Sequence, residues 1–123
     1  MEIRITRNES QDLTILEVAG IVSKEEMFSA LERLYQGTPT TLILWDMSLS
    51  DVSDVETGVL ADFAKRAAVL GVKRKNGRTA IFAPHDLHFG LARMSEVFAD
   101  MAKAPFKFKV FRSRQEALDW LLA

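Results

Sequence analysis

The stretch Leu42–Gly58, LILWDMSLSDVSDVETG, decides the fold of this chain. It begins with four consecutive apolar residues, and this run ends at Asp46. An apolar run that does not alternate with polar residues is typical of a strand buried on both faces, as the central parallel strands of an α/β sheet are. The polar segment that follows predicts a loop, and apolar residues at helical spacing from Val55 predict a helix. We therefore expect a strand, a loop and a helix start, an arrangement that α/β proteins often use to present functional groups.

Strands and helices alternate along the rest of the chain. Apolar and alternating segments predict strands at residues 2–6, 13–19, 40–45, 79–83 and 106–110. Helical spacing predicts helices that begin after Ser23, near Val55, near Asp86 and after Ser113. The order ββαβαβαβα predicts one α/β domain over residues 1–123, with a mixed, mostly parallel five-stranded sheet and four helices. The first two strands are expected to form a hairpin.

Three predicted helix starts carry the pattern Ser-x-x-Glu, which is a capping box. In this motif the serine hydroxyl and the glutamate carboxylate each accept a hydrogen bond from a backbone N–H that the helix leaves unpaired. The three pairs are Ser23 with Glu26, Ser53 with Glu56, and Ser113 with Glu116. The pattern predicts that Ser53 is mainly a structural residue. Asp86 is the predicted N-cap of the third helix, and Gly71 suits the C-terminal cap of the second.

Composition and charge exclude several classes of function. The chain has 123 residues and a formal net charge of -1, so the whole molecule has no attraction to nucleic acid or to anionic membranes. The absence of cysteine excludes disulfides, thiolate metal ligands and a cysteine nucleophile. The first residues, MEIRITRNES, do not form a secretory signal, and no apolar run approaches the ~20 residues of a membrane span. These features predict a cytoplasmic protein with no transmembrane segment and no nucleic-acid partner.

Polar and aromatic residues gather where the predicted parallel strands end. Ligands and partners usually meet an open α/β sheet at this edge, and helix N-termini with free N–H groups also point there. The candidate binding residues are Asp46, Ser48, Asp54, Thr57, His85, Phe89 and Arg93. Thr57 is also the predicted phosphoacceptor, since a phosphate is tolerated near a helix N-terminus. For Phe89 and Arg93 we favour an alternative without a ligand, in which Arg93 pairs with Glu96 in solvent.

The chemistry at this edge admits several interpretations. Asp46 suits a general base or a metal ligand, but an aspartate that hydrogen-bonds loop amides is the simpler interpretation. His85 and His88 suit metal ligation together with nearby aspartates, although no third ligand stands at a diagnostic spacing. Ser48, His85 and an aspartate supply the residue types of a catalytic triad without a G-x-S-x-G nucleophile elbow. We therefore predict a protein that is not an enzyme, with no catalytic residue, no metal and no cofactor.

A basic cluster is expected at the opposite edge of the sheet. Its members are Lys65, Arg66, Lys73, Arg74, Lys75 and Arg78. They surround the C-terminus of a predicted helix, where positive charges are favoured by the helix dipole. We interpret the cluster as a solvated face rather than as a site for nucleic acid or lipid headgroups.

Three stretches carry a family resemblance. They are LILWDMSLSDVSD, FGLARM at Phe89–Met94, and VFRSRQEALDWL at Val110–Leu121. Through them the whole chain resembles the SpoIIAA-like superfamily, which includes STAS domains and anti-sigma-factor antagonists. It looks closest to small bacterial members that share this fold with the CRAL-TRIO lipid carriers. The resemblance implies a single STAS-like domain and a regulatory or binding module that contacts a protein partner through the loop 46–57. A homodimer is compatible with this expectation.

The chain differs from the STAS motif at one position, and its lipid-carrier relatives suggest a second role. Antagonist STAS domains have a strand that ends in Asp, followed by an Asp-Ser-x-Gly-type helix start whose serine is phosphorylated. Asp46 and Asp54 resemble the two aspartates, but Val55 stands where the serine is needed. The lipid-carrier relatives imply a different role, as a carrier or sensor of a lipid-like apolar small molecule. A pocket beside Trp45 and Phe89 would favour this alternative, whereas a closed core with an exposed loop would favour the protein-binding module.

Overall fold

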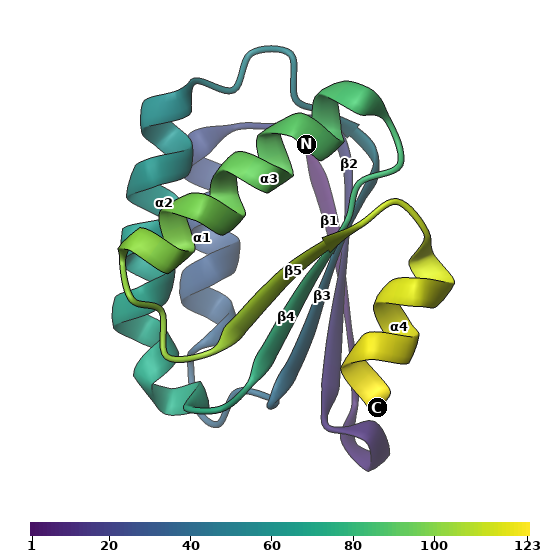
Figure 1. Cartoon of the computed structure of the whole chain (residues 1–123), viewed down its shortest axis with the longest axis vertical. Coiled ribbons are helices and arrows are strands. Elements are labelled where there is room, and N and C mark those ends of the chain that lie inside the picture. The colour runs from purple at the N-terminus through teal and green to yellow at the C-terminus, as the bar shows by residue number, and fades with distance from the viewer.

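A computed structural model describes all residues from 1 to 123, and its five strands form one sheet in the order β1-β2-β3-β4-β5. The strands are β1 (Glu2–Asn8), β2 (Leu13–Ile21), β3 (Leu42–Asp51), β4 (Arg78–Phe82) and β5 (Lys107–Phe111). The helices are α1 (Lys24–Leu34), α2 (Thr57–Leu70), α3 (Asp86–Met101) and α4 (Arg114–Leu122), and two short 3-10 helices cover Glu9–Gln11 and Gly71–Arg74. The predicted element order is confirmed (Figure 1).

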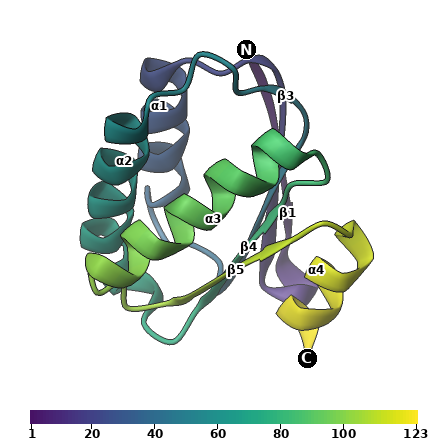
Figure 2. The same cartoon turned by 45° about the horizontal axis from the view of Figure 1, so that its top comes forward.

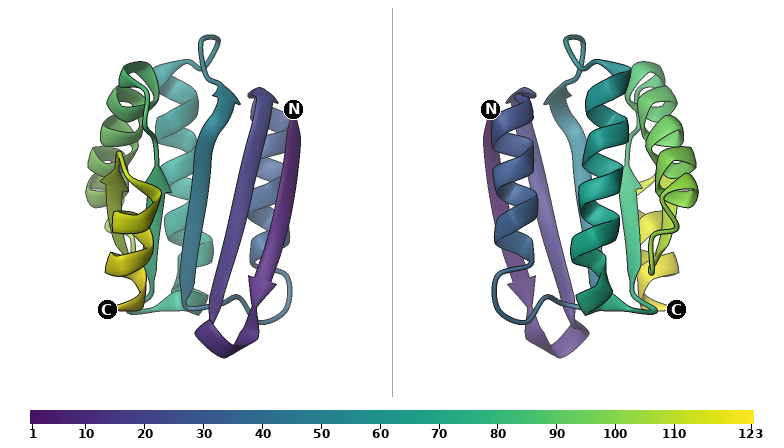
Figure 3. Two further views of the ribbon diagram at one scale, coloured as in Figure 1. Left: turned by 90° about the vertical axis from the view of Figure 1, so that its right-hand side faces the viewer. Right: turned by 90° about the vertical axis from the view of Figure 1, so that its left-hand side faces the viewer.

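The sheet has a different helical cover on each face. β1 pairs with β2 in the antiparallel direction, as predicted, and the pairs from β2 to β5 are parallel. Right-handed crossovers between neighbouring parallel strands place α1, α2 and α3 on one face, where α3 runs obliquely (Figure 2). On the other face α4 lies alone over β3, β4 and β5 and leaves β1 uncovered (Figure 3), while Leu13 at the start of β2 is still buried in the cluster with Leu121 of α4.

β3 supplies both sides of the hydrophobic core. Its residues Ile43 and Trp45 join the cluster under α1 and α2, where the ring centroids of Trp45 and Phe63 are 5.9 Å apart. Between them, Leu44 points to the opposite face and packs with Leu121 of α4. Successive side chains of a strand point to opposite faces, so a strand with two buried faces requires an unbroken apolar run. The packing therefore explains the sequence pattern of β3.

Two of the three predicted capping serines are confirmed as helix N-caps. The Oγ of Ser23 accepts a hydrogen bond from the N–H of Glu26 at 3.3 Å. The Oγ of Ser113 accepts in the same way from the N–H of Glu116 at 3.2 Å. Each bond satisfies one donor that the first turn of the helix leaves unpaired.

The predicted capping box of Ser53 and Glu56 is wrong. Glu56 itself is the N-cap of α2, and its side chain forms no capping hydrogen bond. The hydroxyl and the N–H of Ser53 both donate to Oδ1 of Asp51, at 2.6 and 3.0 Å. This local aspartate turn competes with the cap and delays the start of the helix beyond Val55.

Two other helix ends also differ in detail from the prediction. His85, not Asp86, is the N-cap of α3, and the Asp86 carboxylate instead accepts a hydrogen bond from Arg112 at 2.9 Å. Gly71 is the C-cap of α2, but its φ of -67° is not left-handed. A Cβ at Gly71 would lie 2.5 Å from the ring of Phe106, so close packing is what requires glycine at this position.

The basic cluster is not a uniformly solvated face, because Arg74 is only 3% exposed. Its guanidinium donates five hydrogen bonds, which go to the backbone oxygens of Thr40, Thr41 and Arg78 and to the hydroxyls of Tyr35 and Thr79. Burial lowers the pKa of Arg74, and the interactions with Tyr35 oppose this effect. Arg74 therefore ties the segment before β3 to the start of β4.

Candidate functional site

The strand that leads into the candidate site is longer than the sequence predicts. β3 continues to Asp51 and keeps its parallel pairing with β2 beyond an irregularity, so that Leu49 lies opposite Ala19. Asp46 is consequently inside the strand, opposite Glu17 and Phe82, and the prediction that it follows the strand end is wrong. Hydrogen bonding to β2 outweighs the loop preference of the serines and aspartates in this segment.

Asp46 is a buried carboxylate whose two oxygens are both occupied by the protein. Its Oδ1 accepts hydrogen bonds from the N–H and the hydroxyl of Ser48, at 3.0 and 2.7 Å. Its Oδ2 accepts from Nε of Arg114 in α4 at 3.2 Å, and the side chain is 10% exposed. This geometry matches the structural interpretation of Asp46. Arg114 was not anticipated, since it is 68 residues away and no local pattern connects the two.

Asp54 and Thr57 lie apart from Asp46, before and at the start of α2. Both are exposed, and Thr57 is the first residue of the helix. Asp54 borders a cavity on the α2 and α3 side of the sheet, whereas Asp46 is bonded to α4 on the other side. The two aspartates that resemble the STAS pair therefore do not form one site. Phosphorylation of Thr57 stays a prediction.

Between Asp46 and Asp54, the carboxyl of Asp51 has a lowered pKa. The hydroxyl of Ser53, and then its N–H, hydrogen-bond to Asp51 and hold the pKa of this exposed carboxyl below its ordinary value. The electrostatic interaction with His88 acts in the same direction. Asp51 is therefore an ionised, solvent-exposed group next to the end of β3.

The two histidines of α3 have different surroundings. His85 is exposed, and its ring centroid lies 5.3 Å from that of His88. Nε2 of His88 lies 2.7 Å from the backbone oxygen of Ser50. The hydroxyl of Ser48 donates to Asp46 rather than to His85, so the residues considered for a triad are not connected as one. No group of three or more histidine, aspartate or glutamate side chains is arranged to hold a metal ion.

Phe89 and Arg93 lie one turn apart on α3, where Phe89 packs against the buried cluster that includes Ala92 and Arg93 is exposed. The guanidinium of Arg112 lies 4.2 Å from the centroid of the Phe89 ring. Arg93 forms the predicted ion pair with Glu96 at 3.5 Å, but the pair does not lie fully in solvent, since the Glu96 side chain is only 28% exposed. Neither Phe89 nor Arg93 lines the main cavity of the molecule.

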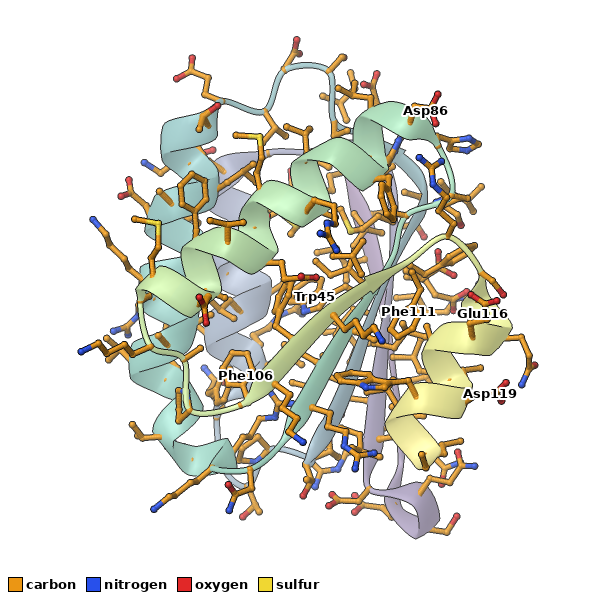
Figure 4. All side chains as sticks on the ribbon, in the orientation of Figure 1. Trp45, Asp86, Phe106, Phe111, Glu116 and Asp119 are labelled. Atoms are coloured by element: carbon orange, nitrogen blue, oxygen red, sulfur yellow. The ribbon has the colours of Figure 1, made fainter.

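That cavity has a volume of about 160 Å³ and lies between the sheet, α2 and α3. Seventeen of the 22 residues that line it are hydrophobic, so its wall is suited to an apolar occupant. Trp45 and Phe106, both labelled in Figure 4, form part of this wall together with Phe63 of α2. Charged residues line one end of the cavity, where it reaches the surface, and these are Lys24, Asp54 and Glu56.

The cavity contains few of the residues that the sequence singled out. Of the candidate binding residues only Asp54 borders it, although His88, considered above as a metal ligand, also lines the wall. The pocket lies beside Trp45 but not beside Phe89. The sequence does not distinguish the apolar wall residues from core residues, because periodicity identifies a buried side chain without showing whether it faces another side chain or a space.

Comparison with known proteins identifies the architecture. No family profile and no curated protein sequence matches the chain. A solved structure does match: an uncharacterized protein of the DUF3478 family from Shewanella loihica PV-4, described as having a SpoIIAA-like fold. The two are 26% identical, the match covers 98% of this chain and 92% of the other, and the TM-score is 0.61. This chain has the SpoIIAA-like fold. The predicted resemblance and α/β class are thus confirmed.

The SpoIIAA-like fold accounts for the arrangement of the helices but does not define a ligand, since one fold supports many functions. None of the helices is both long enough and apolar enough to cross a membrane. What this chain binds has to be argued from its own cavity and surfaces.

Proposed function

We propose that this SpoIIAA-like protein is a non-enzymatic binding module that holds a small apolar molecule in the cavity between α2, α3 and the sheet. The observation that carries the proposal is the apolar wall of the cavity, which includes Trp45, Phe63 and Phe106. Transfer of apolar surface from water into such a space is favourable. A concave apolar pocket with few polar groups is the common form of a small-molecule site.

The volume of the cavity narrows the class of ligand. An apolar cavity of about 150 Å³ in another protein accommodates benzene, and the cavity here is of similar size, about 160 Å³. A single ring or a short alkyl chain therefore fits, whereas a whole phospholipid does not. Met27 and Met47 belong to the wall, and their flexible side chains allow it to adapt to different shapes.

Filling the cavity should abolish ligand binding without damage to the fold. Ala64 lines the cavity from α2 and is 5% exposed. In Ala64→Leu the added carbons occupy the cavity, and we expect unchanged or increased stability, by up to about 2 kcal/mol, because extra apolar surface is buried. Binding of toluene should be lost. Calorimetric titration measures the binding, and urea unfolding measures the stability.

Ala68 provides the matched control on the same helix. It lines a separate, shallow surface groove beside Val69 and Ala102, so Ala68→Leu should bind toluene as the unmodified chain does. Native mass spectrometry of freshly purified protein would identify a natural ligand carried through purification. Failure of the unmodified chain to bind any small apolar compound, with Ala64→Leu destabilised as in a fully packed core, would refute the proposal.

A second candidate function is contact with a protein partner through the segment 46–57, and a specific surface favours it. Leu49 is 76% exposed, and Ile21 at the end of the neighbouring strand is 59% exposed. Leu49 lies opposite Ala19, two positions before Ile21, so the two apolar side chains are on the same side of the sheet. Apolar residues that cluster at the surface often mark interaction sites.

Leu49→Ser should reduce the affinity for such a partner by about fivefold to thirtyfold, since removal of a central apolar contact costs about 1–2 kcal/mol. Capture is measured by affinity purification with the immobilised chain. Val72→Ser is the control, because Val72 is 69% exposed and lies after α2, away from this segment. Asp46 is unsuitable for this test because it is bonded to Arg114. Equal capture by both variants would argue against this surface. Homodimerisation and a cytoplasmic location stay predictions.

A further inference from the structure

Two polar side chains interrupt the apolar wall of the cavity away from its charged end. They are His88 and Ser95, and both belong to α3. A separation of seven residues corresponds to about two helical turns, so the two side chains lie on the same face of the helix. Their hydrogen-bonding state determines what kind of polar group an occupant can bring into the cavity.

The contact of His88 with Ser50 defines which ring nitrogen carries the proton. Nε2 of His88 lies 2.7 Å from the backbone oxygen of Ser50, and a carbonyl oxygen can only accept a hydrogen bond. Nε2 is therefore the donor, and in the neutral imidazole Nδ1 is an acceptor. Nδ1 is buried and has no hydrogen-bond partner in the protein. A buried polar atom without a partner is unfavourable, which makes Nδ1 a natural acceptor for a ligand.

Ser95 also has acceptor capacity but no free donor. Its hydroxyl donates a hydrogen bond to the backbone oxygen of Leu91 at 3.1 Å. The proton of the hydroxyl is thereby used, while the oxygen can still accept. The two polar side chains that α3 contributes to the cavity wall thus offer acceptors and no unused donor.

We infer that the occupant of the cavity is a neutral apolar molecule with one hydroxyl group, an alcohol or a phenol, and that this hydroxyl donates to Nδ1 of His88. The inference rests on the proposed function and specifies its ligand. A carboxylate, ester or ketone has no proton to donate, and a carboxylate would also bring an uncompensated charge into an apolar space. Nδ1 has no exposed surface in this structure, so the hydroxyl reaches it only when a neighbouring wall side chain moves aside while Nε2 keeps its contact with Ser50.

Phenol and toluene provide a direct test, because they have nearly the same size and differ by a hydroxyl in place of a methyl group. A purely apolar cavity binds toluene more tightly, since toluene loses no hydrogen bond to water. With an acceptor in the wall we expect the opposite order. Phenol should bind about fivefold more tightly than toluene, because one additional hydrogen bond contributes about 1 kcal/mol. Calorimetric titration gives both affinities. The ¹⁵N resonance of His88 Nδ1 should shift with phenol and remain unchanged with toluene.

Two variants and the pattern of outcomes separate this inference from the proposed function. His88→Leu should reverse the preference in favour of toluene, whereas Val97→Leu, at an exposed position of the same helix outside the cavity, should leave it unchanged. If toluene binds more tightly than phenol and the Nδ1 resonance does not move, the hydroxyl inference is overturned while the apolar site stands. If neither compound binds, the proposed function itself is overturned. The resonance measurement needs no variant, so it remains decisive if His88→Leu does not fold.

Discussion

Replacement of Arg74 by methionine is expected to lower the free energy of unfolding by about 3–5 kcal/mol. Arg74 is buried, and three of its five hydrogen bonds go to backbone oxygens, those of Thr40, Thr41 and Arg78. Each buried acceptor that loses its partner costs about 1–3 kcal/mol, and hydrogen bonds from a charged group are among the stronger ones. Since domains of this size are stable by only about 5–15 kcal/mol, the loss should be visible at once in a urea titration followed by circular dichroism.

The choice of replacement and of control makes this test specific. Lysine keeps the charge but offers only three donors from a single nitrogen, so Arg74→Lys should fall between the natural chain and the methionine variant. Lys75 follows Arg74 directly and is exposed, and Lys75→Met should change the stability by less than about 0.5 kcal/mol. A loss below about 1 kcal/mol in Arg74→Met would mean that the buried hydrogen bonds are not needed for the fold.

The position of Arg74 also connects the stability of the fold to the cavity. Its guanidinium lies 5.0 Å from the ring centroid of Phe106, and Phe106 lines the cavity. The same aromatic ring also packs closely against Gly71. One wall of the cavity therefore rests on a rigid, fully hydrogen-bonded group. The charged end at Lys24, Asp54 and Glu56 is exposed by contrast, which makes it the natural entrance.

The sequence predicts those parts of the fold that depend on local information. The unbroken apolar run of β3, the alternation in β1 and β5, and the helical spacing in between are each contained within about ten residues. The capping serines Ser23 and Ser113 act on residues three positions away, and both were identified correctly. At Ser53, however, the local pattern predicts a cap that does not form. The same local pattern is present there, but Asp51 offers a nearer partner for the serine.

The candidate site was harder to predict because its contacts join distant parts of the chain. Asp46 and Arg114 are 68 residues apart, and Arg74 reaches Tyr35 across 39 residues. A cavity is even less accessible from sequence, since it is the volume that remains after α3 has packed obliquely across the sheet. Trp45 and Phe63 look like ordinary core residues in the sequence. Only the arrangement of the helices shows that they also border a space.

Alanine at Gly77 is expected to destabilise the protein by about 1–3 kcal/mol, the usual cost of forcing extra atoms into a packed site. A Cβ at Gly77 would lie 2.6 Å from the backbone oxygen of Thr41 and 2.8 Å from that of Arg74, and backbone atoms cannot move aside as the end of a side chain can. The N–H of Gly77 also closes the turn before β4 by donating to the oxygen of Arg74 at 2.7 Å. Urea unfolding measures the loss.

The same substitution at Gly58 should act in the opposite direction. Gly58 lies in the first turn of α2, and a Cβ there would meet no atom within 4 Å, so neither tight packing nor a close neighbour requires glycine at this position. Alanine is a better helix former than glycine by up to about 1 kcal/mol, and Gly58→Ala should stabilise the chain by a similar amount. Because the chemical change is identical at both positions, only the surroundings of the backbone can produce opposite signs. Destabilisation of equal size in both variants would contradict this account.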